Sequence, residues 1–312
     1  MRVAGIDCGT NSIRLLIADV VHTGQGNTLV DVVRTMRVVR LGQGVDATGA
    51  FAAEALERTF AAVKEYKALC DEHQVQAIRF VATSAARDVS NREVFAEEIT
   101  RILGVSPEVI SGDEEASLSF NGAASVRAGQ EGKSLVIDLG GGSTEFVLGD
   151  STGPLAAKSL DMGCVRVTER FQEVGLEAPQ AVDFIDSTLR TLNDHVDVSD
   201  VDAVIMVAGT FTTLTAQALG LSTYESEKIH GAELSFEQMR TATQNMLAYS
   251  REEREALGFM HPGRVDVIQA GAAIVERILH YLETTSGDRP MRLIASEHDI
   301  LDGIAATAVF NA

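Results

Sequence analysis

Two short segments of the chain repeat the residue types that can hold a phosphate group. Asp7-Cys8-Gly9-Thr10-Asn11-Ser12 and Asp138-Leu139-Gly140-Gly141-Gly142-Ser143 share Asp, Gly and Ser in the same order, from position 7 to position 138, an offset of 131 residues. Glycine leaves room for backbone N–H groups to converge on an anion, and hydroxyl side chains add further donors. The alternative is that the two segments are unrelated hairpin turns, and the offset shared by Asp, Gly and Ser argues against this. The predicted phosphate-binding residues are Gly9, Thr10, Asn11 and Ser12 in the first copy, and Gly140, Gly141, Gly142, Ser143 and Thr144 in the second.

Each of these turns begins with an aspartate, which adds metal chemistry to phosphate binding. Asp7 and Asp138 both close short apolar segments. Carboxylates at strand ends can hold Mg²⁺, directly or through water, and the ion bridges phosphate oxygens. An isolated Asp in such a turn more often accepts backbone N–H bonds. The repetition favours a metal site for Mg²⁺, or Mn²⁺ in its place.

The residues around the two turns predict alternating strands and helices, which is the pattern of an α/β protein. The first turn separates predicted strands 3–7 and 13–21, and the second separates 135–138 and 145–148. Residues 41–49 are predicted to form a glycine-rich loop. Further strands are predicted over 28–40, 75–82, 107–110, 155–160, 204–208 and 291–295, and helices over 51–72, 89–103, 113–126, 165–174, 181–195, 211–219, 236–249, 265–284 and 300–309.

A polar, glycine-bearing segment at 127–133 is the predicted crossing between two domains. The chain of 312 residues is long enough for two domains. The expected first domain comprises residues 1–128 together with 299–312, because the last helix is expected to return to it. The second domain is expected to comprise residues 129–298.

The composition excludes several classes of partner. The chain has 45% apolar residues and a formal charge of −19, with 26 basic and 45 acidic residues. A nonspecific DNA- or RNA-binding protein needs a basic face, and an anionic membrane would repel this charge. The three cysteines form no CxxC pair, and no secretion signal is evident at the N-terminus, so a reducing cytoplasm is expected.

The negative charge is unevenly distributed, so it does not exclude a polyanionic substrate. Residues 1–128 hold 13 basic and 17 acidic residues, a balance of −4, whereas residues 129–312 carry −15. Much of the excess lies in 169–202, far in sequence from either turn. The electrostatic field of the net negative charge predicts slow, salt-sensitive binding of a polyanion unless a metal ion and local arginines offset that field.

Several motifs, in order along nearly the whole chain, give a family resemblance. The two turns resemble the phosphate motifs of the Ppx/GppA phosphatases, which are exopolyphosphatases and guanosine pentaphosphate phosphohydrolases of the actin-like superfamily. The resemblance implies two actin-like, ribonuclease H-like domains with a cleft between them. The further matching segments are Ala82-Thr83-Ser84-Ala85-Ala86-Arg87, Ile110-Ser111-Gly112-Asp113-Glu114-Glu115-Ala116, Met162-Gly163-Cys164, Ala208-Gly209-Thr210, Pro262-Gly263-Arg264 and Asp299-Ile300-Leu301-Asp302-Gly303.

The resemblance also implies a mechanism, the Mg²⁺-assisted hydrolysis of a terminal phosphoanhydride. Glu115 matches the family's catalytic base, and Arg87 matches the arginine that points toward phosphate. Glu145 matches a position linked to metal and water placement, so the predicted metal residues are Asp7, Asp138 and Glu145. Glu114 lies about 100° from Glu115 on a helix, and we expect it to face elsewhere and to compensate the helix dipole.

Three further arginines are weaker candidates for the substrate site, and two other functions remain open. Arg14, Arg166 and Arg264 are either guides for an anionic chain or ordinary surface residues. An actin-like ATPase or sugar kinase is one alternative function, and a non-catalytic regulator that binds nucleotide or polyphosphate is another. Cys8 and His298 are expected to have no catalytic or metal role. The chain resembles the short form of the family, in which homodimers are common, although no residue here establishes one.

Overall fold

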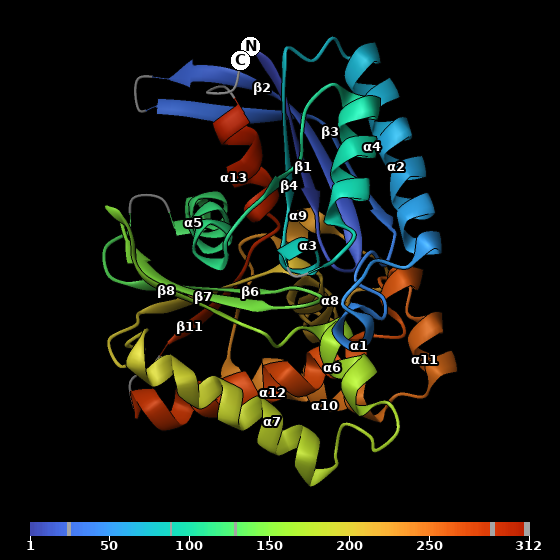
Figure 1. Cartoon of the computed structure of the whole chain (residues 1–312). Helices are drawn as coiled ribbons and strands as arrows, with labels where there is room; N and C mark the ends of the chain where they lie inside the picture. The colour runs from blue at the N-terminus through green and yellow to red at the C-terminus, as the bar shows by residue number, and fades with distance from the viewer. Residues whose placement is uncertain (24–25, 88, 128–129, 288–290, 309–312) are drawn as a thin grey trace. The chain divides into compact units, whose positions relative to one another are not determined.

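The computed structural model describes residues 1–312 except 24–25, 88, 128–129, 288–290 and 309–312 (Figure 1). Its contacts divide the chain into two compact units. Unit 1 comprises Met1–Gly122 and Ile300–Ala312, and unit 2 comprises Ala123–Asp299. The domain boundaries predicted from the sequence were residues 128 and 298. In the described part of the chain, no helix is both long and apolar enough to cross a membrane.

Unit 1 is built on a five-stranded sheet of order β3-β2-β1-β4-β5. β1, β2 and β3 pair antiparallel, whereas β4 runs parallel to β1 and to β5. The long apolar runs of β1 and β4 suit strands that are covered on both faces. The strands are β1 (Arg2–Cys8), β2 (Ser12–Thr23), β3 (Gly26–Val38), β4 (Ala77–Ala82) and β5 (Glu108–Val109).

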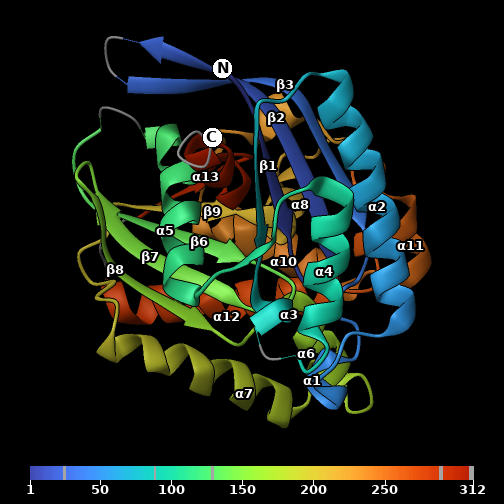
Figure 2. The ribbon, with the colours of Figure 1, turned by 45° about the horizontal axis from the view of Figure 1, so that its top comes forward.

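Helices cover both faces of this sheet. α2 (Ala53–Glu72) and α4 (Arg92–Leu103) lie side by side on one face, and α13 (Ile300–Thr307) lies on the other (Figures 1 and 2). Because side chains alternate along a strand, Ile6 and Cys8 enter the core formed with α2 and α4. Intervening residues of β1, including Asp7, therefore face the side that carries α13. The other helices of the unit are α1 (Val45–Thr48), α3 (Ser84–Arg87) and α5 (Gly112–Ala123), and a 3₁₀ helix, Ala124–Arg127, follows α5.

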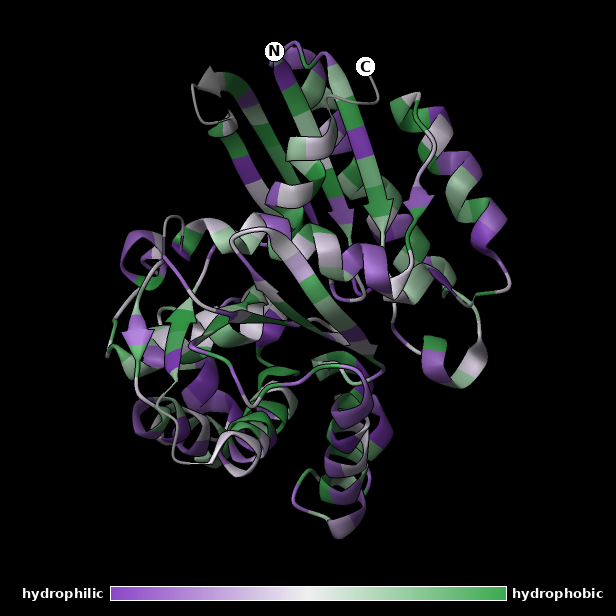
Figure 3. Cartoon of the chain, turned by 90° about the vertical axis from the view of Figure 1, so that its left-hand side faces the viewer, coloured by the Kyte–Doolittle hydropathy of each residue, from purple (hydrophilic) through white to green (hydrophobic). Residues whose placement is uncertain are grey.

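Unit 2 contains a six-stranded sheet of order β10-β11-β9-β6-β7-β8. Figure 3 shows hydrophobic residues running along the strands, interrupted by hydrophilic ones. Leu135, Ile137 and Leu139 of β6 join one large core with the helices of the unit, so Asp138 faces the opposite side of the sheet. The strands are β6 (Ser134–Leu139), β7 (Thr144–Asp150), β8 (Gly153–Leu160), β9 (Ala203–Val207), β10 (Glu233–Leu234) and β11 (Arg292–Ala295). The helices are α6 (Cys164–Phe171), α7 (Pro179–Arg190), α8 (Ala208–Ala218), α9 (Ser226–Ile229), α10 (Phe236–Ala248), α11 (Arg251–Ala256) and α12 (Ile268–Ser286), with 3₁₀ helices at Thr191–Asp194 and Pro262–Arg264.

The α/β class is confirmed, and some predicted elements were wrong in detail. The loop at 41–49 contains α1, whose flanking glycines, Gly44 and Gly49, have φ values of 72° and 65°. These are left-handed values, which glycine adopts at no steric cost. The helix predicted from residue 89 begins instead at residue 92, because the side chain of Asn91 bonds both backbone groups of Phe51.

Candidate active site

The first turn connects β1 to β2, and a neighbouring loop holds its carbonyl groups. Thr10 O accepts from Gly42 N at 2.9 Å, and Asn11 O accepts from the N–H groups of Val39 and Arg40 at 3.1 and 2.8 Å. In a trans peptide the C=O and the following N–H point in opposite directions. The loop therefore aims the N–H groups of Asn11 and Ser12 away from itself, as an anion-binding turn requires. This loop also ends β3 at Val38, two residues before the end predicted from the sequence.

The second turn is held in the same way by the start of α6. Gly140 O accepts from Cys164 N at 3.0 Å, and Gly141 O accepts from Val165 N at 2.8 Å. Gly142 O accepts from Arg166 Nε at 2.8 Å. The N–H groups of Gly141, Gly142 and Ser143 consequently point away from α6, and within the described residues they donate to no protein acceptor.

Glycines allow the close approach between each turn and the segment that holds it. A Cβ atom on Gly163 would lie 2.5 Å from Gly142 N and closer still to the carbonyl of Gly141. A Cβ atom on Gly42 would meet the side chain of Thr10. The sequence prediction missed both contacts, although the family motif contained Gly163. The glycines at positions 42 and 163 were the available signal, because close approach of another backbone segment is one reason for a glycine.

The two aspartates stand in different electrostatic surroundings. Asp7 is paired in register with Arg14 across β1 and β2. Arg14 donates from Nε and Nη2 to Asp7 Oδ2 at 2.9 and 2.7 Å, and Asp7 is only 4% exposed. The equivalent register position in the second copy holds Glu145 opposite Asp138. The first copy therefore balances its aspartate with an arginine, whereas the second places two carboxylates side by side.

The pair in the second copy fits a magnesium ion. Cross-strand partners in an antiparallel sheet point to the same face, and both Asp138 and Glu145 are more than nine-tenths buried. Ser159, the partner of Glu145 on β8, donates to its Oε1 at 2.7 Å. Mg²⁺ commonly binds through one or two carboxylates, with water and substrate phosphates as further ligands. In the part of the chain described here, no three His, Cys, Asp or Glu residues gather as a complete metal cage.

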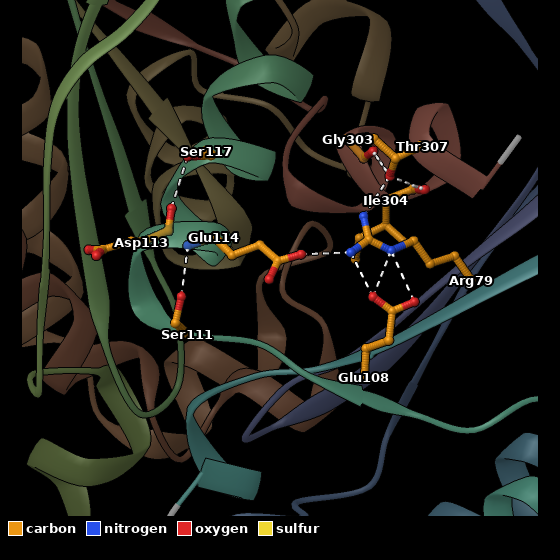
Figure 4. A network of polar contacts seen from close by, with 9 residues as sticks. All are labelled: Arg79, Glu108, Ser111, Asp113, Glu114, Ser117, Gly303, Ile304 and Thr307. Carbon is orange, nitrogen blue, oxygen red and sulfur yellow. Dashed lines mark hydrogen bonds and ion pairs between the residues drawn. The ribbon is translucent and has the colours of Figure 1, made fainter. Parts of the chain in front are cut away.

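The two consecutive glutamates of α5 contact different arginines. Glu115 is 7% exposed, and Arg87 Nη1 donates to its Oε2 at 2.7 Å. Glu114 accepts instead from Arg79 Nη2 at 2.7 Å (Figure 4). Within the described residues, Nε and Nη2 of Arg87 donate to no protein acceptor, so these two donors are available to phosphate oxygens.

The weaker candidates have structural contacts. Arg166 supports the second turn, as described above. Arg264 packs against the backbone of Gly209, donating to its carbonyl at 3.3 Å. The cysteines are all free and buried. Burial raises the pKa of the Cys8 thiol well above its usual value and that of Cys164 to about 11, so neither is a ready nucleophile.

Comparisons with known proteins agree with these motifs. A model of the Ppx/GppA phosphatase family matches residues 17–307. The chain is 45% identical over 317 residues to Exopolyphosphatase 2 of Mycobacterium tuberculosis strain H37Rv, with 97% of each chain covered. A crystal structure of an exopolyphosphatase-like protein superposes with a TM-score of 0.91 at 44% identity, covering 98% of this chain and 96% of the other.

A more distant relative matches the chain over its whole length. The crystal structure of the Ppx/GppA family member from Aquifex aeolicus has a TM-score of 0.79 at 32% identity, covering all of this chain and 98% of the other. These matches extend over the whole α/β fold, actin-like in both units, and not over one motif. The chain therefore belongs to the Ppx/GppA phosphatase family.

Proposed function

We propose that this protein is an exopolyphosphatase, which removes the terminal phosphate of inorganic polyphosphate. The observation that carries the proposal is the buried Glu115 carboxylate held by Arg87, an arginine that retains two donors for phosphate. The similarity to an exopolyphosphatase over nearly the full length supports the same substrate class.

Glu115 is the proposed general base. One of its oxygens is fixed by Arg87 at 2.7 Å, which orients the carboxylate toward a water molecule. Glu115 takes a proton as the water oxygen bonds to the terminal phosphorus and the bridging P–O bond breaks. The products are orthophosphate and a polyphosphate shorter by one unit. Charge that develops on the transferred group is stabilised by the guanidinium of Arg87.

The two glycine turns are the proposed phosphate cradles. Their carbonyl groups are taken by the 39–42 loop and by α6, so their N–H groups face the opposite direction. Backbone donors of this kind bind phosphate without adding a positive side chain. Thr10, Ser12, Ser143 and Thr144 add hydroxyl groups at the same turns, although Thr144 Oγ1 itself donates to the carbonyl of Met162.

Asp138 and Glu145 are the proposed ligands for Mg²⁺. The bound ion would supply positive charge to phosphate oxygens as negative charge shifts toward the leaving group. Ser159 keeps Glu145 in one orientation through its hydrogen bond. Asp7 is the third proposed metal residue, and it would contribute through water because its Oδ2 already accepts from Arg14.

We propose a cytoplasmic location for the protein. All three cysteines are free and buried, as expected for a protein that folds under reducing conditions. The test is cell fractionation with a tagged copy, and recovery in a secreted or membrane fraction would contradict this location.

Phosphate release with a panel of substrates tests the proposed activity. The panel contains long-chain polyphosphate, tripolyphosphate, guanosine pentaphosphate and ATP, each with Mg²⁺ and with excess EDTA. Hydrolysis of polyphosphate is expected in the presence of Mg²⁺ and not with excess EDTA. Guanosine pentaphosphate is the second expected substrate, because it ends in the same kind of phosphoanhydride bond. Hydrolysis of ATP alone would support an actin-like ATPase, and no hydrolysis of any substrate would support a binding protein.

A further inference from the structure

The guanidinium of Arg79 joins four elements of unit 1. Arg79 lies in β4, and its side chain is only 10% exposed. Its Nε and Nη2 donate to Glu108 of β5 at 3.1 and 2.7 Å, its Nη2 to Glu114 of α5 at 2.7 Å, and its Nη1 to Thr307 of α13 at 2.7 Å (Figure 4). Burial lowers the pKa of Arg79, and its hydrogen bonds to Glu108 and Glu114 outweigh this effect. Arg79 therefore remains a cation at the junction of β4, β5, α5 and α13.

Glu114 is the member of this network that lies beside the proposed base. Ser111 caps α5 by accepting from Glu114 N at 3.2 Å. Ser111 and Glu114 have the spacing of a capping box, in which the glutamate side chain returns to the N–H of the capping residue. The carboxylate of Glu114 extends to Arg79 instead, as Figure 4 shows. Glu114 therefore attaches the first turn of α5 to the sheet.

Two ion pairs on consecutive residues fix the rotation of α5 about its own axis. Successive side chains on a helix point about 100° apart. Glu114 meets Arg79 from β4, and Glu115 meets Arg87 from α3, the helix that follows β4. Ala116, Leu118 and Phe120 of α5 are buried and restrain the helix as a whole, and the two ion pairs add restraints at its first turn, where Glu115 lies. We infer that Arg79 is a positioning residue that acts through Glu114 to set the orientation of Glu115, an inference that rests on the proposed function.

The expected displacement is large enough to matter for catalysis. A side-chain tip lies roughly 5–6 Å from a helix axis, so a rotation of about 20° moves the Glu115 carboxylate by about 2 Å. A misplacement of about 1 Å can lower a rate by about 100-fold. The network contributes little to stability by comparison, because the side chains of Glu108 and Glu114 are 40% and 46% exposed.

Packing of α13 supports the same geometry. A Cβ atom on Gly303 would lie 2.8 Å from the carbonyl carbon of Leu118, so α13 and α5 touch backbone to backbone. A Cβ atom on Gly5 would lie 2.8 Å from the backbone N of Ala305, so α13 also rests directly on β1. Backbone contacts with α13 therefore support α5. The proposed role of Arg79 and Glu114 is to set the rotation of α5 about its own axis.

Substitution of Glu114 tests the inference, with Asp113 as the matched control. Asp113 is an exposed acid in the same first turn, so Asp113→Ala removes the same helix-dipole contribution without touching Arg79. Glu114→Ala is expected to lower kcat on polyphosphate 10- to 100-fold with KM changed by less than twofold. Glu114→Gln is expected to recover most of the loss, because its amide oxygen still accepts from Arg79. Asp113→Ala is expected to retain kcat within twofold of the wild type.

A readout that does not depend on activity separates this inference from the proposed function. Hydrogen exchange of the first-turn amides of α5 is expected to be about two- to fivefold faster in Glu114→Ala and Arg79→Lys than in wild type or Asp113→Ala. Wild-type exchange and wild-type kcat in Glu114→Ala would overturn the inference while leaving the enzyme assignment intact. An inert wild type would overturn the proposed function alone, and the exchange measurement would still decide whether Arg79 and Glu114 hold α5.

Discussion

Replacement of Gly163 by alanine is the sharpest test of how the second phosphate turn is held. Gly163 precedes α6 with φ of −130° and ψ of 164°. Alanine adopts these extended values without strain, so only the added methyl group matters. That methyl would lie 2.5 Å from Gly142 N and nearer to the carbonyl of Gly141. The atoms it meets are backbone, which cannot rotate out of the way.

The size of the effect follows from the contacts that must give way. Ordinary van der Waals contact begins at 3.4 Å, so turn and helix must separate by about 1 Å. That shift stretches the three backbone bonds from α6 to Gly140 and Gly141, now 2.8–3.1 Å long. Overpacking costs about 1–3 kcal/mol, which lowers the melting temperature of a unit of this size by about 2–12 °C. A displacement of about 1 Å at the phosphate turn lowers kcat by about 100-fold.

The assay combines calorimetry with phosphate release from polyphosphate at 25 °C, where the variant remains folded. Gly258→Ala is the control, because its methyl would collide with the backbone carbonyl of Ser222 in the same unit. Both variants are expected to melt earlier, and only Gly163→Ala is expected to lose about 100-fold in kcat. Equal activity of the two folded variants would refute the account of how α6 positions the turn.

Two further predictions concern the metal site and the thiols. Ser159→Ala removes the 2.7 Å hydrogen bond to Glu145 and is expected to raise the Mg²⁺ concentration for half-maximal activity about tenfold. Ser199→Ala, at an exposed serine, is the control. The same metal dependence in both variants would show that Ser159 does not orient Glu145 for the metal. Burial raises the pKa of Cys164 to about 11, so the folded state holds a proton that the unfolded state releases near its ordinary pKa of 9.0. The contribution of the Cys164 thiol to the free energy of unfolding is fully present below pH 9 and is lost as the pH rises to 11. Urea titrations at pH 8 and 10.5 should therefore show a smaller loss of stability in Cys164→Ala than in wild type, and an identical loss would contradict the assigned burial effect.

The repeat in the sequence predicted much of the local geometry of the site. Equivalent residues at the common offset make equivalent bonds, from Gly9 N to Ser12 O and from Gly140 N to Ser143 O, both at 3.0 Å. The strands that flank each turn also lie close to the predicted positions, because uninterrupted apolar runs of this length suit buried strands. The roles of Glu115, Arg87 and the metal residues remain predictions for the experiments above.

The contacts that hold these groups in place could not be predicted from the sequence. The 39–42 loop and Gly163 meet the turns only after the chain has folded, because more than 20 residues separate them from the groups they contact. Arg79 sits within the apolar run of β4, and its partners Glu108 and Thr307 come from distant segments. A local sequence pattern shows that a charged residue interrupts an apolar strand. It does not show which distant side chain that residue contacts.

A comparison of turnover and binding in Glu115→Gln tests directly whether Glu115 is the general base. Glutamine keeps the size of the side chain and can still accept from Arg87, and it cannot take a proton from water. Turnover of polyphosphate is expected to fall by 10²- to 10⁴-fold, while the dissociation constant of polyphosphate, measured by calorimetry with Mg²⁺, stays within about threefold of the wild type. Turnover within tenfold of the wild type, in a folded variant that binds polyphosphate normally, would contradict the assignment of Glu115 as the base.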